Sequence, residues 1–124
     1  MTAAVSRTLL LVEDDDDMRE DLATILGYEG YRVSTAADGQ QALDELKGGL
    51  KPTLILLDLM MPRMNGWQFR MAQRADPDLD PIPVVVLSGS SDLVRQAEEL
   101  GAVGYLAKPI DLGKLLGILK QRCC

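Results

Sequence analysis

Histidine is absent from this sequence of 124 residues. Its absence excludes a histidine general base, imidazole metal ligands and a phosphohistidine within the chain. Cysteine occurs only at Cys123 and Cys124, two adjacent positions that cannot join distant parts of a fold. We therefore expect two reduced, exposed thiols in a cytoplasmic protein.

Long apolar runs are missing as well. No stretch approaches the ~20 apolar residues of a membrane span, and residues 1 to 8 lack the apolar segment of a signal peptide. The last residues do not fit the pattern of C-terminal lipidation. Basic residues are also scarce, since 13 bases against 19 acids leave a net charge of −6. We therefore expect no membrane insertion and no direct binding of nucleic acid.

The chain does contain a regular alternation of apolar runs and amphipathic segments. Apolar residues make up 47% of the sequence, which is enough for one domain over residues 1–124. The apolar runs predict strands at 8–12, 31–37, 52–59, 84–88 and 103–107. The amphipathic segments predict a first helix with an apolar stripe from Met18 and an end at Gly27, and further helices over 38–49, from 66 to 75, over 91–101 and from 111 onward. Five strand–helix units in series favour an α/β fold, with a parallel sheet covered by helices on both faces.

Within the fourth of these helices, the apolar spacing predicts that Leu93, Val94, Ala97 and Leu100 face inward. In an open α/β sheet, function belongs at the carboxyl ends of the strands. The polar residues that end or follow four of the strands are Glu13, Asp14, Asp15, Asp58, Ser88 and Lys108. If these strands are neighbours, several carboxylates, a hydroxyl and an ammonium meet at one edge of the sheet.

Oxygen ligands without sulfur or imidazole suit Mg²⁺, and Mn²⁺ as a substitute. A carboxylate beside such a cation can act as a nucleophile and form an acyl phosphate. Lys108 would supply positive charge and Ser88 a hydrogen-bond donor for phosphoryl transfer. Each signal has an ordinary explanation, because acids before a helix often form a solvated first turn and Ser-Gly is a common loop. The combination at four successive strand ends favours a site that accepts a phosphoryl group.

Four segments resemble motifs of the response regulator receiver domain of two-component signalling, in its chemotaxis-regulator-like form. They are "LLVEDD", "LLDLMMPRMNG", "VVVLSG" and "GYLAKP". The resemblance covers nearly the whole chain and implies a flavodoxin-like (βα)₅ fold with strand order 2-1-3-4-5. It implies a phosphorylation-activated switch rather than an enzyme with an external substrate. Asp58 would accept a phosphoryl group from a sensor histidine kinase or a histidine phosphotransfer protein, with self-catalysed transfer and autodephosphorylation.

The resemblance also implies a role for each matched residue. The Mg²⁺ ligands would be Glu13, Asp14, Asp58 and the backbone carbonyl of Met60. Ser88 would bond the phosphoryl oxygen, Lys108 would pair with the phosphoryl group or with Asp58, and the bond to Pro109 would be cis. Tyr105 would change rotamer with the state of Ser88. The face made by the fourth helix, fifth strand and fifth helix would then change shape for a downstream protein target.

The exposed residues expected on that face are Arg95, Gln96, Glu99 and Lys114. A phosphorylation-dependent dimer through the same face is left open. Trp67 and Gln68 depart from the family, where a smaller apolar residue and an acid are expected. Met60 and Ser90 occupy positions that tune hydrolysis of the acyl phosphate, and we hypothesise that the bulky Met60 shields the phosphoryl group.

Three other functions fit parts of the sequence. A Mg²⁺-dependent phosphohydrolase of the haloacid-dehalogenase type would need a second Asp at the position of Met60. A flavodoxin-like FMN carrier would need a phosphate-binding loop where this chain has five acids. A receiver-like docking module that takes no phosphoryl group remains open, although Asp58, Ser88 and Lys108 are all present.

The five acids at 13–17 are expected to differ in role. Glu13 and Asp14 would carry the metal because they come first after the strand. Asp15 is either an acid behind the metal ligands or the cap of the following helix. Asp16 and Asp17 are expected in the first helical turn, facing water. A shift of one position in the strand would exchange Glu13 for Asp15.

Overall fold

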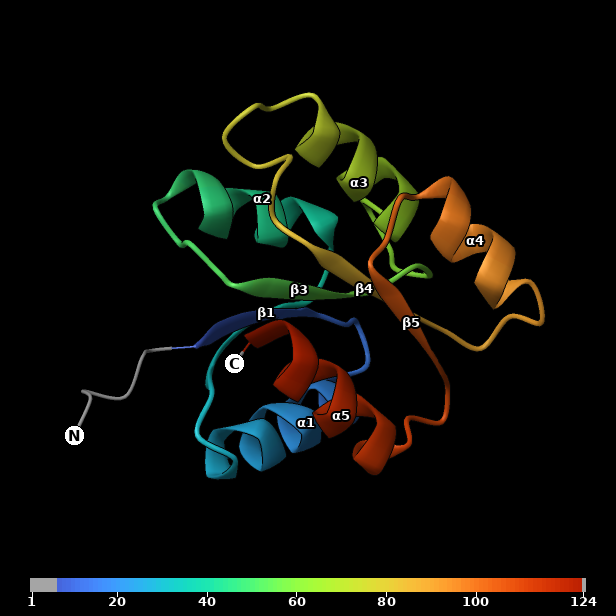
Figure 1. Ribbon diagram of the computed structural model, residues 1–124. Helices are drawn as coiled ribbons and strands as arrows, with labels where there is room; N and C mark the ends of the chain where they lie inside the picture. Colours follow the sequence, from blue (N-terminus) through green and yellow to red (C-terminus); the bar gives the residue numbers. More distant parts are fainter. Residues whose placement is uncertain (1–6, 124) are drawn as a thin grey trace.

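The computed structural model describes residues 7–123, so Cys124 and residues 1–6 lie outside the described residues. Five strands and five helices alternate along the chain: β1 (Thr8–Val12), α1 (Asp16–Tyr28), β2 (Arg32–Ala36), α2 (Gly39–Lys47), β3 (Leu54–Asp58), α3 (Gly66–Arg74), β4 (Val84–Ser88), α4 (Leu93–Glu99), β5 (Gly104–Ala107) and α5 (Leu112–Cys123). The strands form one parallel sheet in the order β2-β1-β3-β4-β5 (Figure 1). The predicted fold class and strand order are confirmed.

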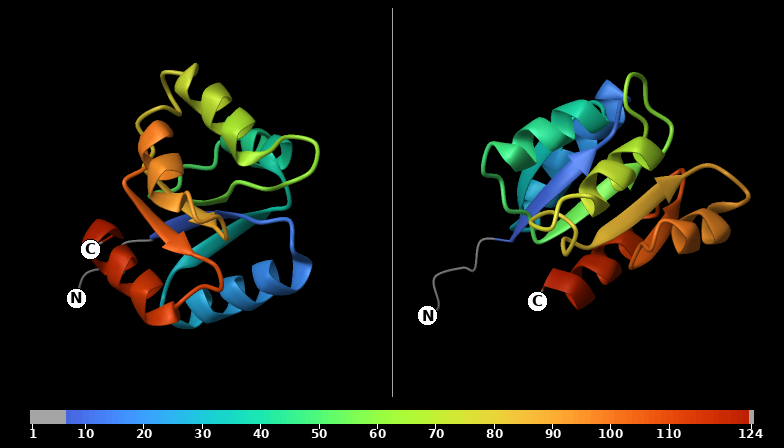
Figure 2. Two further views of the ribbon diagram at one scale, coloured as in Figure 1. Left: turned by 90° about the vertical axis from the view of Figure 1, so that its right-hand side faces the viewer. Right: turned by 90° about the horizontal axis from the view of Figure 1, so that it is seen from above.

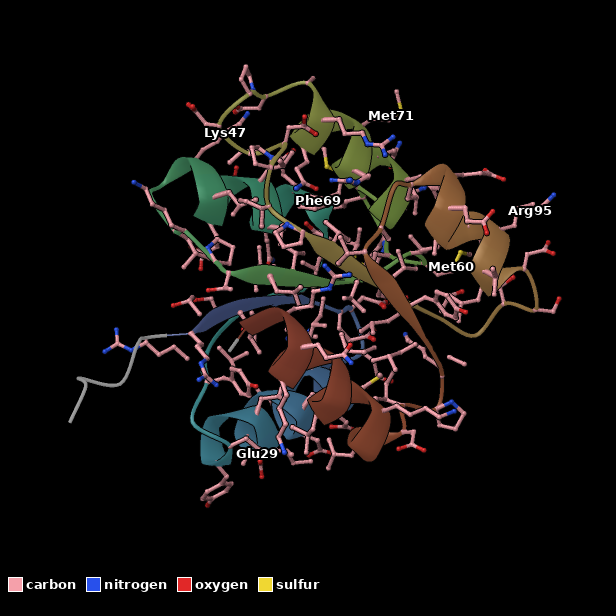
Figure 3. The ribbon with its side chains drawn as sticks, viewed as in Figure 1. Glu29, Lys47, Met60, Phe69, Met71 and Arg95 are labelled. Atoms are coloured by element: carbon pink, nitrogen blue, oxygen red, sulfur yellow. The ribbon has the colours of Figure 1, made fainter. Side chains whose placement is uncertain are left out.

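The sheet is the middle of three layers. Helices α2, α3 and α4 cover one face, and α1 and α5 cover the other (Figures 1 and 2). Each face has its own apolar core, one including Phe69 and Leu43 and the other including Leu26 and Leu119. Figure 3 shows Phe69 directed into the layer between α3 and the sheet, and Met71 directed outward. Among residues 7–123, no helix combines the length and hydropathy that crossing a membrane requires.

The central strands are buried along their whole length. Every residue of β3 and of β4 is buried, as expected for parallel strands with a helical layer on each face. Their register pairs Asp58 with Leu87 and Val12 with Leu57, and it pairs Ser88 with Ala107. The carboxyl ends of β1, β3, β4 and β5 are therefore level with one another at one edge of the sheet.

Local sequence explains how the loops at this edge begin the helices. Asn65 caps α3 by accepting a hydrogen bond from the backbone of Gln68, whose side chain bonds back to Asn65. Gly66 follows, and a Cβ atom at this position would lie 2.6 Å from the backbone oxygen of Asp58. Only glycine allows the loop after β3 to approach the strand end this closely.

Two local predictions were wrong. Helix α1 was predicted to end at Gly27, but it runs from Asp16 through Gly27 to Tyr28. The chain turns instead at Gly30, which has a φ of +97° that glycine adopts without strain. Val94, predicted to face inward, is 50% exposed, because α4 packs on the core through Leu93 and Ala97 on its other side.

Candidate functional site

Three carboxylates and one ammonium meet at the carboxyl edge of the sheet. One oxygen from each of Glu13, Asp14 and Asp58 lies within 4.8 Å of the others. Glu13 is fully buried, Asp58 is buried and Asp14 is exposed. Lys108 Nζ lies 2.8 Å from Glu13 Oε1 and 3.2 Å from Asp58 Oδ1. The structure thus brings together four of the side chains that the sequence analysis selected.

The charges of this cluster are unequally compensated. Burial raises the pKa of Asp58, the neighbouring carboxylate of Glu13 raises it further, and together they bring it to about 7 against the opposing charge of Lys108. Burial also acts to raise the pKa of Glu13, but the ion pair with Lys108 and a hydrogen bond from the backbone N–H of Asp15 outweigh it and lower this pKa. Lys108 lies closer to Glu13, so the uncompensated negative charge falls on Asp58.

The donor set fits a divalent cation. With all three carboxylates ionised, the cluster and Lys108 carry two net negative charges, which one divalent ion would neutralise. Within the described part of the chain, Glu13 Oε1 is buried and accepts no hydrogen bond of good geometry, although Lys108 lies nearby. The ligands are oxygen atoms only, and the exposed Asp14 opens the cluster to water. These features suit Mg²⁺ or Mn²⁺ better than a metal that prefers sulfur or imidazole.

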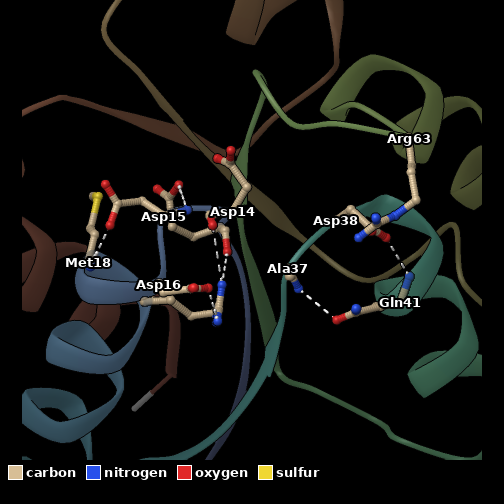
Figure 4. Close-up of polar contacts among 10 residues, drawn as sticks. Asp14, Asp15, Asp16, Met18, Ala37, Asp38, Gln41 and Arg63 are labelled. Atoms are coloured by element: carbon tan, nitrogen blue, oxygen red, sulfur yellow. Dashed lines mark hydrogen bonds and ion pairs between the residues drawn. The ribbon is translucent and has the colours of Figure 1, made fainter.

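The acids at 13–17 divide between the cluster and the start of α1. Asp15 caps α1, because its side chain accepts a hydrogen bond of 3.0 Å from the backbone N–H of Met18 (Figure 4). Of the two alternatives left open for Asp15, the structure shows the cap. Asp16 and Asp17 lie exposed in the first turn, as predicted. No shift of the strand exchanges Glu13 for Asp15.

The sequence analysis missed the contacts that Arg19 makes with the loop after β1. Its guanidinium donates a 2.9 Å hydrogen bond to the backbone oxygen of Glu13 and a longer one of 3.5 Å to that of Asp14. It also forms a 2.6 Å ion pair with Asp16. Arg19 therefore fixes the backbone of the loop from which the two acids of the cluster extend. Only the spacing of an arginine one helical turn after the acids could have suggested this.

The loop after β3 is held from two sides. The backbone N–H of Met60 lies 3.3 Å from Asp58 Oδ1, while the Met60 side chain is 77% exposed. Arg63 donates a 2.6 Å hydrogen bond to the buried Asp38, the cap of α2 (Figure 4). Burial raises the pKa of Asp38, but the backbone N–H of Gln41 and the guanidinium of Arg63 outweigh it and lower this pKa. The ion pair therefore anchors the loop that contains Met60 to the first turn of α2.

The ends of β4 and β5 complete the edge. Ser88 is buried, and its hydroxyl donates a 3.2 Å hydrogen bond to Gln96 Oε1 in α4. Gln96 was predicted to be exposed on the α4 face. That prediction was wrong, because Gln96 is partly buried and its side chain accepts a hydrogen bond from Ser88 beneath the helix. Tyr105 is 45% exposed, and the peptide bond between Lys108 and Pro109 is cis, as the resemblance implied.

The other residues predicted on the face of α4, β5 and α5 are exposed: Arg95, Glu99 and Lys114. Arg95 points away from the sheet in Figure 3 and lies 2.9 Å from Asp92 and 3.7 Å from Glu99. Trp67, which departs from the family pattern, is partly buried and packs against the core between α3 and the sheet.

Comparison with known proteins supports the resemblance stated from the motifs. A family model described as the response regulator receiver domain matches residues 9–120. The transcriptional regulatory protein PdtaR of Mycobacterium tuberculosis is 40% identical over 115 residues, covering 92% of this chain and 55% of PdtaR. The DNA-binding response regulator MtrA of Mycolicibacterium smegmatis is 36% identical over 116 residues, covering 92% of this chain and 49% of MtrA. The chain spans about half the length of these relatives.

Solved structures with the same fold cover the chain almost entirely. The chemotaxis response regulator CheY4 of Vibrio cholerae has a TM-score of 0.85 at 29% identity, covering 94% of this chain and 98% of CheY4. A response regulator receiver protein of Pseudomonas putida has a TM-score of 0.86 at 29% identity, covering 96% of this chain and 99% of that protein. The family match, the strand order and these neighbours agree: the chain belongs to the response regulator receiver domain family of two-component signalling.

Proposed function

We propose that Asp58 is the phosphoacceptor of this receiver domain and that Glu13, Asp14, Asp58 and the backbone carbonyl of Met60 hold Mg²⁺ beside it. The observation that supports this is the cluster at the sheet edge, where Lys108 contacts both Glu13 and Asp58. Phosphoryl transfer depends mainly on positioning and on neutralising charge. When bound, Mg²⁺ would supply positive charge next to the phosphoryl oxygens.

The proposed step is a transfer from a phosphohistidine of a partner. A carboxylate oxygen of Asp58 attacks the phosphorus atom, a P–O bond forms and the P–N bond breaks. The electron pair of that bond stays on the imidazole nitrogen of the donor, which then takes a proton from water. Lys108 pairs with the Asp58 carboxylate before the transfer and would pair with the phosphoryl oxygens after it. Autodephosphorylation would reverse the modification by attack of water on the same phosphorus atom.

The partners of the domain are also part of this proposal. A sensor histidine kinase or a histidine phosphotransfer protein would supply the phosphoryl group, and the face of α4, β5 and α5 would present the change to a downstream protein. Tyr105 lies on this face and is exposed in the structure, so an inward rotation would alter it. We propose residues 1–124 as a single receiver domain that acts in the cytoplasm and does not itself bind nucleic acid, consistent with its net charge of −6.

The test is phosphorylation by a small phosphodonor, which needs no identified kinase. The wild-type protein is incubated with acetyl phosphate and Mg²⁺, and the intact mass is measured before and after brief alkaline treatment. We expect a base-labile adduct that is lost in Asp58→Asn and kept in Asp21→Asn, a matched change at an exposed acid of α1. No adduct on the wild type, or an equal adduct on Asp58→Asn, would overturn the proposal. Steady release of phosphate from an ester substrate would instead support a phosphohydrolase.

A further inference from the structure

We infer that Gln96 is a positioning residue that holds the Ser88 hydroxyl in the resting state and competes with the phosphoryl group for its proton. The inference rests on the proposed role of Asp58 and adds a residue outside the motifs that identified the family. Gln96 lies in the middle of α4, eight positions after Ser88, and its side chain turns inward from an otherwise exposed face.

The Ser88 hydroxyl makes two hydrogen bonds in the resting state. Its Oγ atom donates to Gln96 Oε1 at 3.2 Å and accepts the backbone N–H of Ser90 at 3.1 Å. A serine hydroxyl has one proton, and this proton is directed to Gln96. Phosphoryl oxygens are acceptors only, so a phosphoryl group on Asp58 can bond Ser88 only if the hydroxyl leaves Gln96. The two acceptors therefore exclude each other.

The contacts that hold α4 in place show which part of the helix would be released when Ser88 leaves Gln96. At its C-terminal end, Arg70 Nε and an amino group of Arg74 each donate a 2.7 Å hydrogen bond to the backbone oxygen of Leu100. Arg70 is buried, and its other hydrogen bonds go to Gln73 Oε1 and to the backbone oxygen of Gly101, directly after the helix.

The N-terminal end of α4 packs on the core through Leu93 but, within residues 7–123, has no polar anchor like the arginines at Leu100. Asp92 at the cap position makes no capping hydrogen bond within the described residues, and its side chain pairs with Arg95 on the surface. Within the part of the chain that the structure describes, the bond between Gln96 and Ser88 is thus the side-chain hydrogen bond that joins the body of α4 to the end of β4. Loss of this tie would free the N-terminal part of α4 while Arg70 and Arg74 keep its C-terminal end in place.

The test measures binding of beryllofluoride, a phosphoryl mimic, in the presence of Mg²⁺. Four proteins are compared by titration: wild type, Gln96→Leu, Ser88→Ala and the double variant. Leucine matches glutamine in size but offers no acceptor, so Gln96→Leu should bind the mimic about three- to tenfold more tightly, the range expected for one lost competing hydrogen bond. In the Ser88→Ala background the same change should have no effect, because no proton is left to compete for.

The hydrogen bond by which Gln96 holds Ser88 in the resting state is called the latch below, and two further variants separate it from a general loosening of the fold. Gln96→Glu keeps an acceptor oxygen and should show no gain. Gln40→Leu removes a glutamine side-chain bond of 3.0 Å to Asp44 in a different helix and should bind as the wild type does.

Each result decides between defined outcomes. If the wild type binds the mimic but Gln96→Leu binds it no better, the latch is refuted and the proposed function stands. A gain that persists in the Ser88→Ala background, or that Gln96→Glu shares, also refutes the latch. If the wild type does not bind the mimic, the phosphoacceptor role fails and the latch fails with it.

Discussion

Replacing Asp58 with Asn should stabilise the metal-free protein, even though Asp58 is the residue proposed to react. The pKa of Asp58 is raised from 3.8 to about 7 because the group is buried beside Glu13. Each pKa unit corresponds to about 1.4 kcal/mol, so ionising Asp58 destabilises the fold by at most about 4 kcal/mol. Asparagine removes this charge but also loses the contact of 3.2 Å with Lys108. We therefore expect a net gain of about 2 kcal/mol at about pH 8.

The difference in stability between Asp58→Asn and the wild type should depend on pH. Between about pH 4 and pH 7 the folded chain keeps a proton on Asp58 that the unfolded chain has released. The free energy of unfolding of the wild type therefore contains a contribution that falls as the pH rises through this window. Asp58→Asn lacks that contribution, so its advantage should grow from near zero at about pH 4 to its full size at about pH 8.

The assay is urea denaturation in the presence of a chelator, followed by far-ultraviolet circular dichroism. Asp38→Asn is the matched control, because Asp38 is also buried but its pKa is lowered. A carboxyl with a lowered pKa stabilises the fold above its unfolded pKa, so this variant should be destabilised at neutral pH and less so in acid. Equal free energies for Asp58→Asn and wild type at both pH values, or an equal gain at both, would refute the electrostatic reasoning.

Three further predictions concern neighbouring contacts. Arg70→Met should lower the free energy of unfolding by about 1–3 kcal/mol, because it leaves the buried backbone oxygen of Leu100 with one donor fewer; urea denaturation measures this, and an unchanged midpoint contradicts it. Arg63→Ala should cost about 1–2 kcal/mol, since the buried Asp38 loses its ion pair; a loss that does not shrink in acid would argue against that cause. Met60→Asn should speed loss of the phosphoryl group, followed by intact mass, if Met60 shields it, and an unchanged rate counts against shielding.

The fold was readable from the sequence because its central strands, β3 and β4, are apolar along almost their whole length. In a run such as 84–88, the side chains on both faces of the strand must be buried. A parallel sheet that is covered by helices on both sides buries them. Errors arose where local signals compete with packing. Gly27 has open space around it and is tolerated inside α1, so a glycine alone did not end the helix. Val94 has the right spacing for burial, but α4 packs on the core through Leu93 and Ala97 and leaves Val94 half exposed.

The site was readable for the same topological reason, since parallel strands deliver their ends to one edge. What could not be read were contacts between residues far apart in the chain. Asp38 was identified as a helix start, but its pairing with Arg63 depends on how the loop after β3 folds back. Gln96 has no local feature that distinguishes it from a solvent-facing glutamine. Its inward bond exists because α4 packs across the end of β4.

In the resting site the excess negative charge and the hydrogen bond of Ser88 are separate features, and this separation makes a prediction. Three carboxylates lie together and only Glu13 and Asp58 contact the ammonium of Lys108, whereas the proton of Ser88 is already donated to Gln96. A bound divalent cation corrects the charge but offers Ser88 no new acceptor, so the tie to α4 should survive Mg²⁺ alone. In a Mg²⁺ titration followed by amide chemical shifts, residues near Asp14 and Asp58 should respond while α4 stays unchanged until beryllofluoride is added. Equal shifts in α4 with Mg²⁺ alone would show that charge, and not competition for one proton, controls the helix.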